Sequence, residues 1–374
     1  MTTLKTYFKD YRFAVLFYSN QHITGFKNCI YVSNKNPSGS VVPNKNYSTF
    51  INYDHKNDIE AFCEKETNPL KFPRHLLIEA EQVIDVESLS DLTALPTHQK
   101  ITVKPTVTKQ EYLKNVAVLK QHIQLGDIYE INYCITFEAH DVTIDPMALY
   151  QKLNAISNAP YSALAKFENR YIVSSSPELF LSKKGNTVIT KPIKGTAKRG
   201  LTPEEDEIIK QNLKSNLKER TENVMIVDVA RNDLSRIAAK GSVTVEKLCE
   251  IESYSQVHQM VSTVSCELKE NTSFKAIIDA TFPMASMTGA PKHRAMQLID
   301  DYEIYNRGPY SGALGYIEAN GDFNLNVLIR SIFYDEEKQY LSFTVGSAIT
   351  AMCNPEEEYE ECLLKAYAMI KALE

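Results

Sequence analysis

The alternation of hydrophobic and polar residues predicts two β-rich blocks with helices between and after them. The first block covers residues 161–193 and the second covers residues 312–345. Asn320-Gly321 gives a hairpin signal inside the second block, and residues 335–338 form a charged turn. Because strand runs followed by helices are typical of an α+β domain, we expect two packed antiparallel sheets with helices outside. The likeness of the two blocks also suggests an internal duplication.

Capping signals predict where the helices begin. Thr108 followed by Glu111 resembles a capping box, and apolar residues recur at helical spacing after it. Thr202-Pro203 with two acids behind it is typical of a helix start, because proline suits the first helical position. Asn354-Pro355 begins a final helix that we expect to reach the C-terminus.

The N-terminal third of the chain has a less regular pattern. Residues 12–17 form a strand-like run, residues 34–46 are rich in Asn, Ser and Pro, and residues 70–105 resemble a connection with little periodicity. We therefore expect a small, irregular β-rich part over residues 1–105, packed on one large domain over residues 106–374. The α+β fold class is predicted from the pattern of residues 106–374.

Composition narrows the class of protein. The chain has 374 residues, 43% hydrophobic and 24% charged, which is typical of a globular protein. The net charge is -6 without a block of basic residues, so we expect no nucleic-acid partner. We also expect no membrane association, because no apolar run is long enough to span a bilayer and the N-terminus lacks a signal-peptide core. Seven cysteines without a CxxC pair predict reduced thiols in the cytoplasm.

A lysine at the end of a strand is the first candidate for chemistry. Pro192 and Gly195 flank Lys194 where an apolar run gives way to a loop, so the amine could reach a ligand. A solvated lysine in a surface turn is the alternative. If Lys194 acts as a nucleophile, we expect burial and the neighbouring Lys191 or Lys198 to lower its pKa.

Two pairs of glutamates at helical spacing are candidates for a metal site. Glu219 and Glu222 share one helix face, and Glu358 and Glu361 show the same spacing on the final helix. Carboxylate oxygens from two helices could hold a hard cation such as Mg²⁺, which keeps waters or a substrate oxygen in its other positions. Each pair alone also fits a solvated acidic face.

The segment that opens with Ser286 is a candidate anion site. Ser286 or Thr288 could cap a helix whose first position is Pro291. Free N–H groups at such a helix start bind carboxylates. An ordinary helix cap without a ligand is the alternative.

Single polar residues near apolar strands complete the list of candidates. Arg330 lies in an apolar run that we expect to be a strand, and a substrate carboxylate or an internal ion pair would satisfy it there. Gly346, taken to close the next strand, could present backbone N–H groups. Glu178 could donate a proton if burial raises its pKa, whereas His258 is more simply structural.

Several long motifs, in this order, resemble those of the chorismate-utilising enzymes. This family includes the large subunits of anthranilate synthase and aminodeoxychorismate synthase, as well as isochorismate and salicylate synthases. The resemblance covers roughly residues 110–370 and is carried by Pro192-Ile193-Lys194-Gly195-Thr196, residues 218–228 with Arg231-Asn232-Asp233, Thr288-Gly289-Ala290-Pro291-Lys292, Arg307-Gly308 with Tyr310, and Ile329-Arg330. It implies the chorismate-binding fold and a Mg²⁺ cofactor. The turn Gly346-Ser347-Ala348 and the pair Met284-Ala285 depart from the family pattern.

Three positions favour one branch of this family. Lys194 resembles aminodeoxychorismate synthase component I, whereas anthranilate synthases carry alanine there. Glu130 stands where isochorismate synthases use a lysine. Gln259 stands where anthranilate synthases carry a histidine linked to pyruvate loss, and an amide cannot shuttle a proton as imidazole does. The expected reaction converts chorismate and ammonia to 4-amino-4-deoxychorismate.

The resemblance also implies residue roles. Lys194 would attack the ring at C2, and Glu178 would protonate the departing 4-hydroxyl. The metal would be held by Glu219, Glu222, Glu358 and Glu361, and the substrate by Thr196, Gln259, Ser286, Tyr310, Arg330, Gly346 and Lys365. The chain lacks a Gly-x-Cys-x-Gly glutaminase elbow, so we expect a separate glutamine amidotransferase subunit to supply ammonia. The alternatives are anthranilate synthase component I and a non-catalytic chorismate-binding module.

Overall fold

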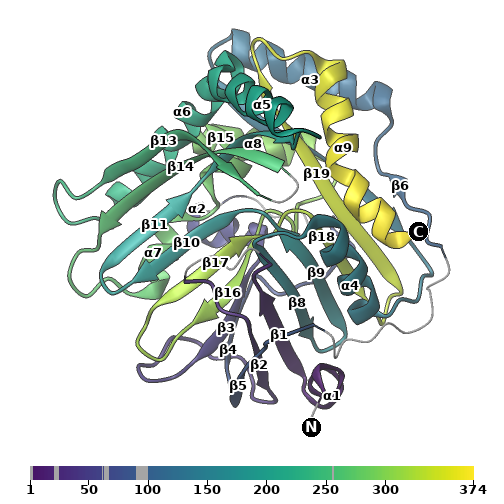
Figure 1. Ribbon diagram of the computed structural model, residues 1–374, viewed down its shortest axis with the longest axis vertical. Helices are drawn as coiled ribbons and strands as arrows, with labels where there is room; N and C mark the ends of the chain where they lie inside the picture. Colours follow the sequence, from purple (N-terminus) through teal and green to yellow (C-terminus); the bar gives the residue numbers. More distant parts are fainter. Residues whose placement is uncertain (1–2, 21–24, 61, 63–66, 90–99, 255–256) are drawn as a thin grey trace.

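The computed structural model describes residues 3–20, 25–60, 62, 67–89, 100–254 and 257–374. Their strands form two antiparallel sheets, and most helices lie outside them (Figure 1). The predicted α+β fold with two antiparallel sheets is therefore confirmed. Part of the predicted connection, residues 90–99, lies outside the described residues.

The first sheet, sheet A, contains ten strands of the described part. Its order is β15 (Gly289–Ala290), β7 (Glu130–Ala139), β19 (Tyr340–Thr350), β18 (Ser331–Asp335), β9 (Arg170–Ser176), β8 (Tyr161–Phe167), β1 (Phe13–Tyr18), β2 (Cys29–Ser33) and β5 (Gln82–Asp85), and β6 (Lys104–Pro105) also pairs with β7. Strand β7 pairs with β19 along its whole length.

The second sheet, sheet B, has nine strands in the described part. Its order is β12 (Ile193–Lys198), β14 (Val257–Glu267), β11 (Thr187–Lys191), β10 (Leu179–Lys184), β17 (Phe323–Val327), β16 (Ala313–Ile317), β3 (Tyr47–Ile51) and β4 (His75–Glu79), and β13 (Thr244–Ser253) also pairs with β14. Strands from both sides of residue 105 therefore share each sheet: β1 pairs with β8, and β3 pairs with β16.

Burial on both faces explains why β1 reads as an unbroken apolar run. Phe13, Val15 and Phe17 belong to the cluster between the two sheets. Ala14 and Leu16 belong to a second cluster on the other face of sheet A. Because successive side chains in a strand point to opposite faces, both sets must be apolar to be buried.

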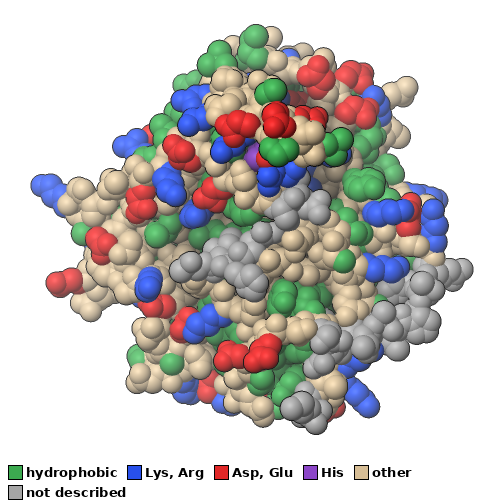
Figure 2. All heavy atoms as spheres, in the orientation of Figure 1, with side chains coloured by type: hydrophobic (Ala, Val, Ile, Leu, Met, Phe, Trp, Pro, Cys, Tyr) green, Lys and Arg blue, Asp and Glu red, His purple; other side chains and the backbone are tan. Residues whose placement is uncertain are grey.

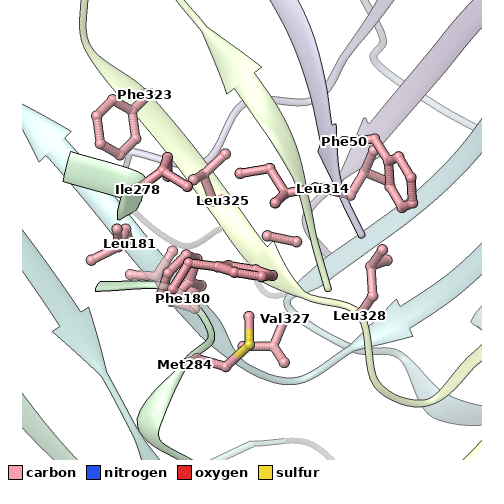
Figure 3. Packing of buried hydrophobic residues seen from close by; sticks show 14 of the residues in the cluster. Phe50, Phe180, Leu181, Ile278, Met284, Leu314, Phe323, Leu325, Val327 and Leu328 are labelled. Atoms are coloured by element: carbon pink, nitrogen blue, oxygen red, sulfur yellow. The ribbon is translucent and has the colours of Figure 1, made fainter. Parts of the chain in front are cut away.

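The cluster between the sheets is close-packed around sheet B (Figure 3). Phe50 of β3 and Leu314 of β16 lie on one side of this view, and Phe323 and Leu325 of β17 lie near Ile278 of helix α7 (Phe274–Thr281). Cys134 and Cys266 belong to this cluster, and Cys249 is also buried.

Each predicted β-block crosses from one sheet to the other, which the block pattern did not predict. Strands β8 and β9 lie in sheet A, but β10 and β11 lie in sheet B; likewise β16 and β17 lie in sheet B, but β18 and β19 lie in sheet A. The two crossings contact each other, because Val327 N–H donates to the Glu178 carbonyl at 3.0 Å and Ser175 N–H donates to the Arg330 carbonyl at 3.1 Å. The crossings thus place Glu178 and Arg330 side by side.

The helices cover the outer face of sheet A and the end of the molecule near β12 and β14 (Figure 1). Helices α3, α4 and α9 supply apolar residues to the cluster on that outer face. The remaining helical bounds are α1 (Leu4–Asp10), α2 (Lys56–Glu60), α3 (Lys109–Gln124), α4 (Pro146–Ser157), α5 (Pro203–Ser215), α6 (Leu217–Ser235), α8 (Lys292–Tyr302) and α9 (Pro355–Leu373), with short 3-10 turns η1 (Tyr53–His55) and η2 (Ala285–Met287).

Three predicted helix starts are confirmed. Thr108 makes the capping box with Glu111, Thr202 accepts from the Glu205 N–H before α5, and Asn354 accepts from the Glu356 N–H before α9. In the described part of the chain, no helix is long and apolar enough to cross a membrane. The face in Figure 2 carries acidic and basic side chains interspersed over most of its extent.

The predicted start of α8 is wrong in detail. The helix begins at Lys292, and Pro291 is its cap residue rather than its first position. Ser286 and Thr288 do not cap it: Ser286 lies in the 3-10 turn, and the Thr288 hydroxyl donates back to the carbonyl of Ala285 at 3.2 Å. The chain is already turned by η2, so the hydroxyls are used before α8 begins.

Candidate active site

Glu178 stands at the first crossing between the sheets and is buried. Its Oε1 accepts a hydrogen bond from the Ser286 hydroxyl at 2.6 Å. Burial raises the pKa of Glu178 to about 7, against the lowering effects of the Ser286 hydrogen bond and the Lys194 charge. A small cavity adjoins both side chains, and Asp233 and Thr281 also line it. Glu178 can therefore hold a proton near neutral pH.

Lys194 is held at the edge of sheet B by an irregular strand. The register of β12 against β14 shifts between Ile193 and Thr196, and Gly195 has φ +84°. A Cβ on Gly195 would lie 3.0 Å from Glu219 Oε2, so a larger residue would press on this side chain, and the positive φ itself favours glycine. The Lys194 side chain is 10% exposed and reaches across to sheet A, where it donates to Glu130 Oε1 at 2.5 Å.

The expected lowering of the Lys194 pKa is wrong. Burial lowers this pKa, but the carboxylates of Glu130 and Glu222 raise it by more, so the pKa lies above its ordinary value. The neighbouring lysines do not oppose this effect: Lys191 pairs with Glu252 at 3.3 Å, and Lys198 is exposed. Lys194 is therefore an ammonium at neutral pH.

The predicted glutamates of α6 and α9 face one another across the site. Glu222 is buried, burial raises its pKa to about 7, and its Oε1 accepts no hydrogen bond from the described residues. Burial also raises the pKa of Glu219 and of Glu358, and Lys218 donates to Glu358 Oε1 at 2.7 Å. Lys218 thereby joins the two helices.

Glu361 lies one turn along α9 from Glu358. Burial raises the pKa of Glu361, but Lys365, 2.6 Å away, together with the charges of Lys218 and Lys194 brings it below its ordinary value. Among the described residues, no group of three or more His, Cys, Asp or Glu side chains is close enough to form a ready-made metal site. A Mg²⁺ ion that keeps several waters and a substrate oxygen needs only one or two protein carboxylates, so these glutamates suit it as ligands.

Lys365, Gly346 and Arg330 meet beside the second crossing. The Lys365 ammonium donates to the Gly346 carbonyl at 2.8 Å. Gly346 lies inside β19 rather than at its end, which corrects its predicted position, because β19 continues to Thr350 in register with β7. Arg330 lies in the bend between β17 and β18 with φ +52°, not inside a strand as predicted.

The Arg330 side chain remains available for a ligand. Its guanidinium donates a long hydrogen bond of 3.5 Å to the Lys365 carbonyl, and no ion pair to it is found among the described residues. Burial lowers its pKa from the ordinary arginine value. A substrate carboxylate would restore the interactions that burial removes.

The remaining predicted residues are Thr196, Gln259, Tyr310 and His258. Thr196 and Gln259 are opposite each other on β12 and β14, and the Gln259 Oε1 accepts no hydrogen bond from the described residues. Tyr310 is buried, and its hydroxyl accepts from the Cys134 thiol at 3.7 Å. His258 lies between Ser253, at 2.8 Å, and Asp206, at 3.0 Å, which fits a structural role.

Two charged residues of the site were not among the candidates. Glu130 is the partner of Lys194, and Lys218 is the partner of Glu358. The signal for Glu130 was an acid between the apolar residues Ile128 and Ile131 at the start of a strand. A buried strand position seldom carries a carboxylate without a cation to pair with it.

A buried acid that holds its proton near neutrality, a buried lysine and paired carboxylates on two helices are typical of an enzyme pocket for a carboxylated substrate. The chain belongs to the chorismate binding enzyme family, which matches residues 13–371.

Sequence relatives come from two branches of this family. The chain is 41% identical over 282 residues to aminodeoxychorismate synthase of Arabidopsis thaliana, covering 74% of this chain and 30% of that protein. It is 39% identical over 280 residues to anthranilate synthase component 1 of Acetivibrio thermocellus, covering 74% of this chain and 55% of that protein. The chain thus spans about a third to a little over half of the length of these relatives.

A solved structure has the same fold. Anthranilate synthase component I of Streptococcus pneumoniae superposes with a TM-score of 0.76 at 26% identity, covering 90% of this chain and 83% of that one. The similar identities to the two branches mean that overall similarity does not separate them. Individual residues in the site must do so.

Proposed function

We propose that this chain is the chorismate-aminating component of an aminodeoxychorismate synthase, converting chorismate and ammonia to 4-amino-4-deoxychorismate for folate synthesis. The observation that carries the proposal is Lys194: a buried lysine on β12, at the position where it resembles this branch, with its ammonium hydrogen-bonded to Glu130. A solvated surface lysine, the alternative, is incompatible with 10% exposure of its side chain.

Lys194 and Glu178 act on opposite ends of one displacement. The Lys194 nitrogen attacks C2 of the ring, the two conjugated double bonds shift, and the C4–O bond breaks as Glu178 gives its proton to the departing hydroxyl. Ammonia then attacks C4, the double bonds shift back, and the C2–N bond breaks to free Lys194. This divides one difficult displacement into two easier ones. The Lys194 charge lowers the pKa of Glu178, which supports a short distance between the two side chains in these roles.

The carboxylates of α6 and α9 would hold Mg²⁺. Glu222 and Glu361 are the direct ligands in this proposal, with Glu219 and Glu358 beside them. The orphaned Oε1 of Glu222 supports this assignment, because a buried carboxylate oxygen without a donor is costly unless a cation completes it. When bound, the ion supplies positive charge that offsets a substrate carboxylate.

Arg330 and Lys365 would hold the remaining negative charge of the substrate, next to the Gly346 backbone. Tyr310, Ser286, Thr196 and Gln259 would surround the ring and the side chain. The charges of Arg330 and Lys365 support this assignment, because Arg330 has no ion pair among the described residues and its guanidinium contacts the Lys365 carbonyl. Lys365 pairs with Glu361 at 2.6 Å. Bidentate contact from a guanidinium fixes orientation as well as charge.

Ammonia would come from a separate glutamine amidotransferase subunit in the cytoplasm. The sequence has no glutaminase elbow that could release ammonia from glutamine. The described cysteines are all free and buried, which supports a reducing compartment.

Product analysis separates this proposal from its alternatives. The chain would be incubated with chorismate, Mg²⁺ and an ammonium salt, and the products separated by chromatography with mass detection. Aminodeoxychorismate supports the proposal. Anthranilate with an equal amount of pyruvate identifies anthranilate synthase component I, and binding without turnover identifies a non-catalytic module.

A further inference from the structure

The ammonium of Lys194 is already engaged by a side chain from the other sheet. Glu130, the first residue of β7, accepts from it at 2.5 Å, and its own side chain is 1% exposed. Strand pairing fixes Glu130 on both sides, opposite Thr350 of β19 and Ala290 of β15. The carboxylate therefore cannot move far from the lysine nitrogen, and this short contact between rigid strands needs an explanation.

A nucleophilic lysine must lose a proton before it attacks. We propose that Glu130 is the base that takes this proton from Lys194, an inference that rests on the covalent step of the proposed function. Glu130 touches the reacting nitrogen, and its second oxygen, Oε2, is buried without a hydrogen-bond donor among the described residues. A carboxylate in hydrogen-bond contact with the group whose proton it would take meets the geometric requirement for a general base.

Other carboxylates act on Lys194 through their charge. The charged groups that act on Lys194 from the elements packed around it are Glu130 of β7, Glu222 and Glu219 of α6, Glu361 of α9 and Glu178 of the first crossing. Glu361 is bound to Lys365, and Glu178 is bound to Ser286. Of this set, Glu130 alone has a hydrogen bond to the lysine nitrogen in the described part of the chain.

The protons of the full cycle balance among Lys194, Glu130, Glu178 and the reactants. Lys194 gives one proton to Glu130, and the freed lone pair forms the N–C2 bond. Glu178 gives its proton to the hydroxyl, which leaves C4 as water. After ammonia attacks C4, the C2–N pair returns to Lys194 and the proton on Glu130 returns with it. The new C4 ammonium gives one proton back to Glu178.

A purely structural ion pair is the competing explanation, and the pH dependence distinguishes the two. If the proton passes to Glu130, deprotonation of Lys194 needs no hydroxide. If glutamine replaces Glu130, the hydrogen bond to Lys194 can remain, but the proton must leave to solvent. The rate then becomes proportional to hydroxide until Lys194 itself titrates.

The test measures the rate of adduct formation between Lys194 and chorismate, with Mg²⁺ but without ammonia, by quenched-flow intact mass spectrometry. The parent chain and Glu130→Gln are compared over a range of pH around neutrality. We expect Glu130→Gln to be slower at neutral pH by about 10²–10⁴-fold, the usual contribution of a general base. We also expect the ratio of its rate to the parent rate to rise about tenfold per pH unit, since Glu178 titrates in both proteins and cancels.

Two further variants make the comparison decisive. Glu130→Asp keeps a carboxylate, so we expect a slower rate whose ratio to the parent does not change with pH. Glu138→Gln, on the same strand but hydrogen-bonded to Tyr340 at 2.7 Å, is the matched control and should keep the parent rate. Circular dichroism checks that each variant is folded, and Glu130→Asp carries the test if Glu130→Gln does not fold.

Each outcome decides the matter. A Glu130→Gln rate equal to the parent rate, or a reduced rate with a constant ratio across pH, overturns the role of Glu130 as base, as does a rising ratio for Glu130→Asp. In those cases the parent adduct is still present, so the proposed function survives. If the parent chain itself forms no adduct at any pH, the covalent step fails and the role of Glu130 fails with it.

Discussion

The hydroxyl of Ser286 donates to Glu178 Oε1 at 2.6 Å, and this contact links the 3-10 turn before α8 to the crossing between the sheets. The hydrogen bond lowers the pKa of Glu178, whereas burial raises it, and burial dominates so that the pKa reaches about 7. Because a general acid must carry its proton, this balance sets the pH range in which Glu178 can work.

Glu178→Gln should lower turnover by about 10²–10⁴-fold and leave chorismate affinity nearly unchanged, because the amide cannot donate a proton to the departing hydroxyl. In the parent chain, the rate of adduct formation should fall as pH rises through about 7, since the acid form of Glu178 is then lost. Stopped-flow kinetics and calorimetric titration would measure the two quantities.

Ser286→Ala is the control for this assignment. It removes a hydrogen bond that lowers the pKa of Glu178, so the fall in rate should move to higher pH. If the pH profile of the rate does not move, a group other than Glu178 causes the fall in rate. A loss confined to affinity in Glu178→Gln would reassign this residue to binding.

Metal removal tests the glutamates of α6 and α9. Activity should disappear with a chelator and return with added Mg²⁺, and Glu361→Gln should weaken metal-dependent chorismate binding because one carboxylate ligand is lost. Glu360→Gln is the matched control, since Glu360 lies next to it on α9 but is 62% exposed and pairs with Lys109. Full turnover by Glu361→Gln at ordinary Mg²⁺ would rule out its role as a ligand.

Local signals predicted three helix starts correctly but failed at the start of α8, and the partition of strands between sheets could not be predicted. Thr108, Thr202 and Asn354 cap helices through contacts within three residues. A hairpin and a crossing between sheets share the same alternation of side chains, so the pattern alone cannot tell Glu178 or Arg330 from a residue in an ordinary turn. Long-range strand pairing decides which sheet each strand joins.

The same limit applies to the site. Lys194 was predicted from a motif and Glu178 from its place beside the first β-block, and in the structure the Lys194 charge acts on the buried Glu178. The pKa of Lys194 was predicted in the wrong direction, because its partner Glu130 lies 64 residues away on the other sheet. The sequence neighbour Lys191 pairs instead with Glu252, and the largest charges on Lys194 come from residues far away in the sequence.

Gly195→Ala tests the close approach of β12 to α6. An alanine with positive φ loses roughly 1–2 kcal/mol of stability, and here its Cβ would also press on Glu219. Gly185→Ala is the matched control, because Gly185 has φ +60° but no neighbour within 4 Å. Both should unfold at lower denaturant concentration, but only Gly195→Ala should weaken Mg²⁺-dependent binding. Equal binding in the two variants would contradict the role of this contact.

The nitrogen source gives a separate prediction. Because the chain has no glutaminase elbow, we expect product with an ammonium salt, more of it as rising pH increases free ammonia, and none with glutamine alone. Adding a glutamine amidotransferase subunit of this pathway should restore glutamine-dependent turnover. Chromatography of the product would measure both, and glutamine-dependent turnover by the purified chain would contradict the prediction.

The last prediction concerns the covalent role of Lys194. Mixing the chain with chorismate and Mg²⁺ in the absence of ammonia should give a species heavier than the free chain in intact mass spectra, because Lys194 attacks C2 and no amine is present to displace it. Peptide mapping should locate the added mass on Lys194. Ammonium added afterwards should release it as aminodeoxychorismate.

Lys194→Ala should abolish the heavy species while chorismate still binds, because Arg330, Lys365 and the metal ligands remain. Its product can shift, since water or ammonia could then approach C2 directly. Lys198→Ala is the matched control, for Lys198 lies on the same strand but is exposed, and it should form the adduct at the parent rate. If Lys194→Ala makes aminodeoxychorismate as fast as the parent, Lys194 has only a structural role in β12. The choice of aminodeoxychorismate synthase over anthranilate synthase then loses its main support.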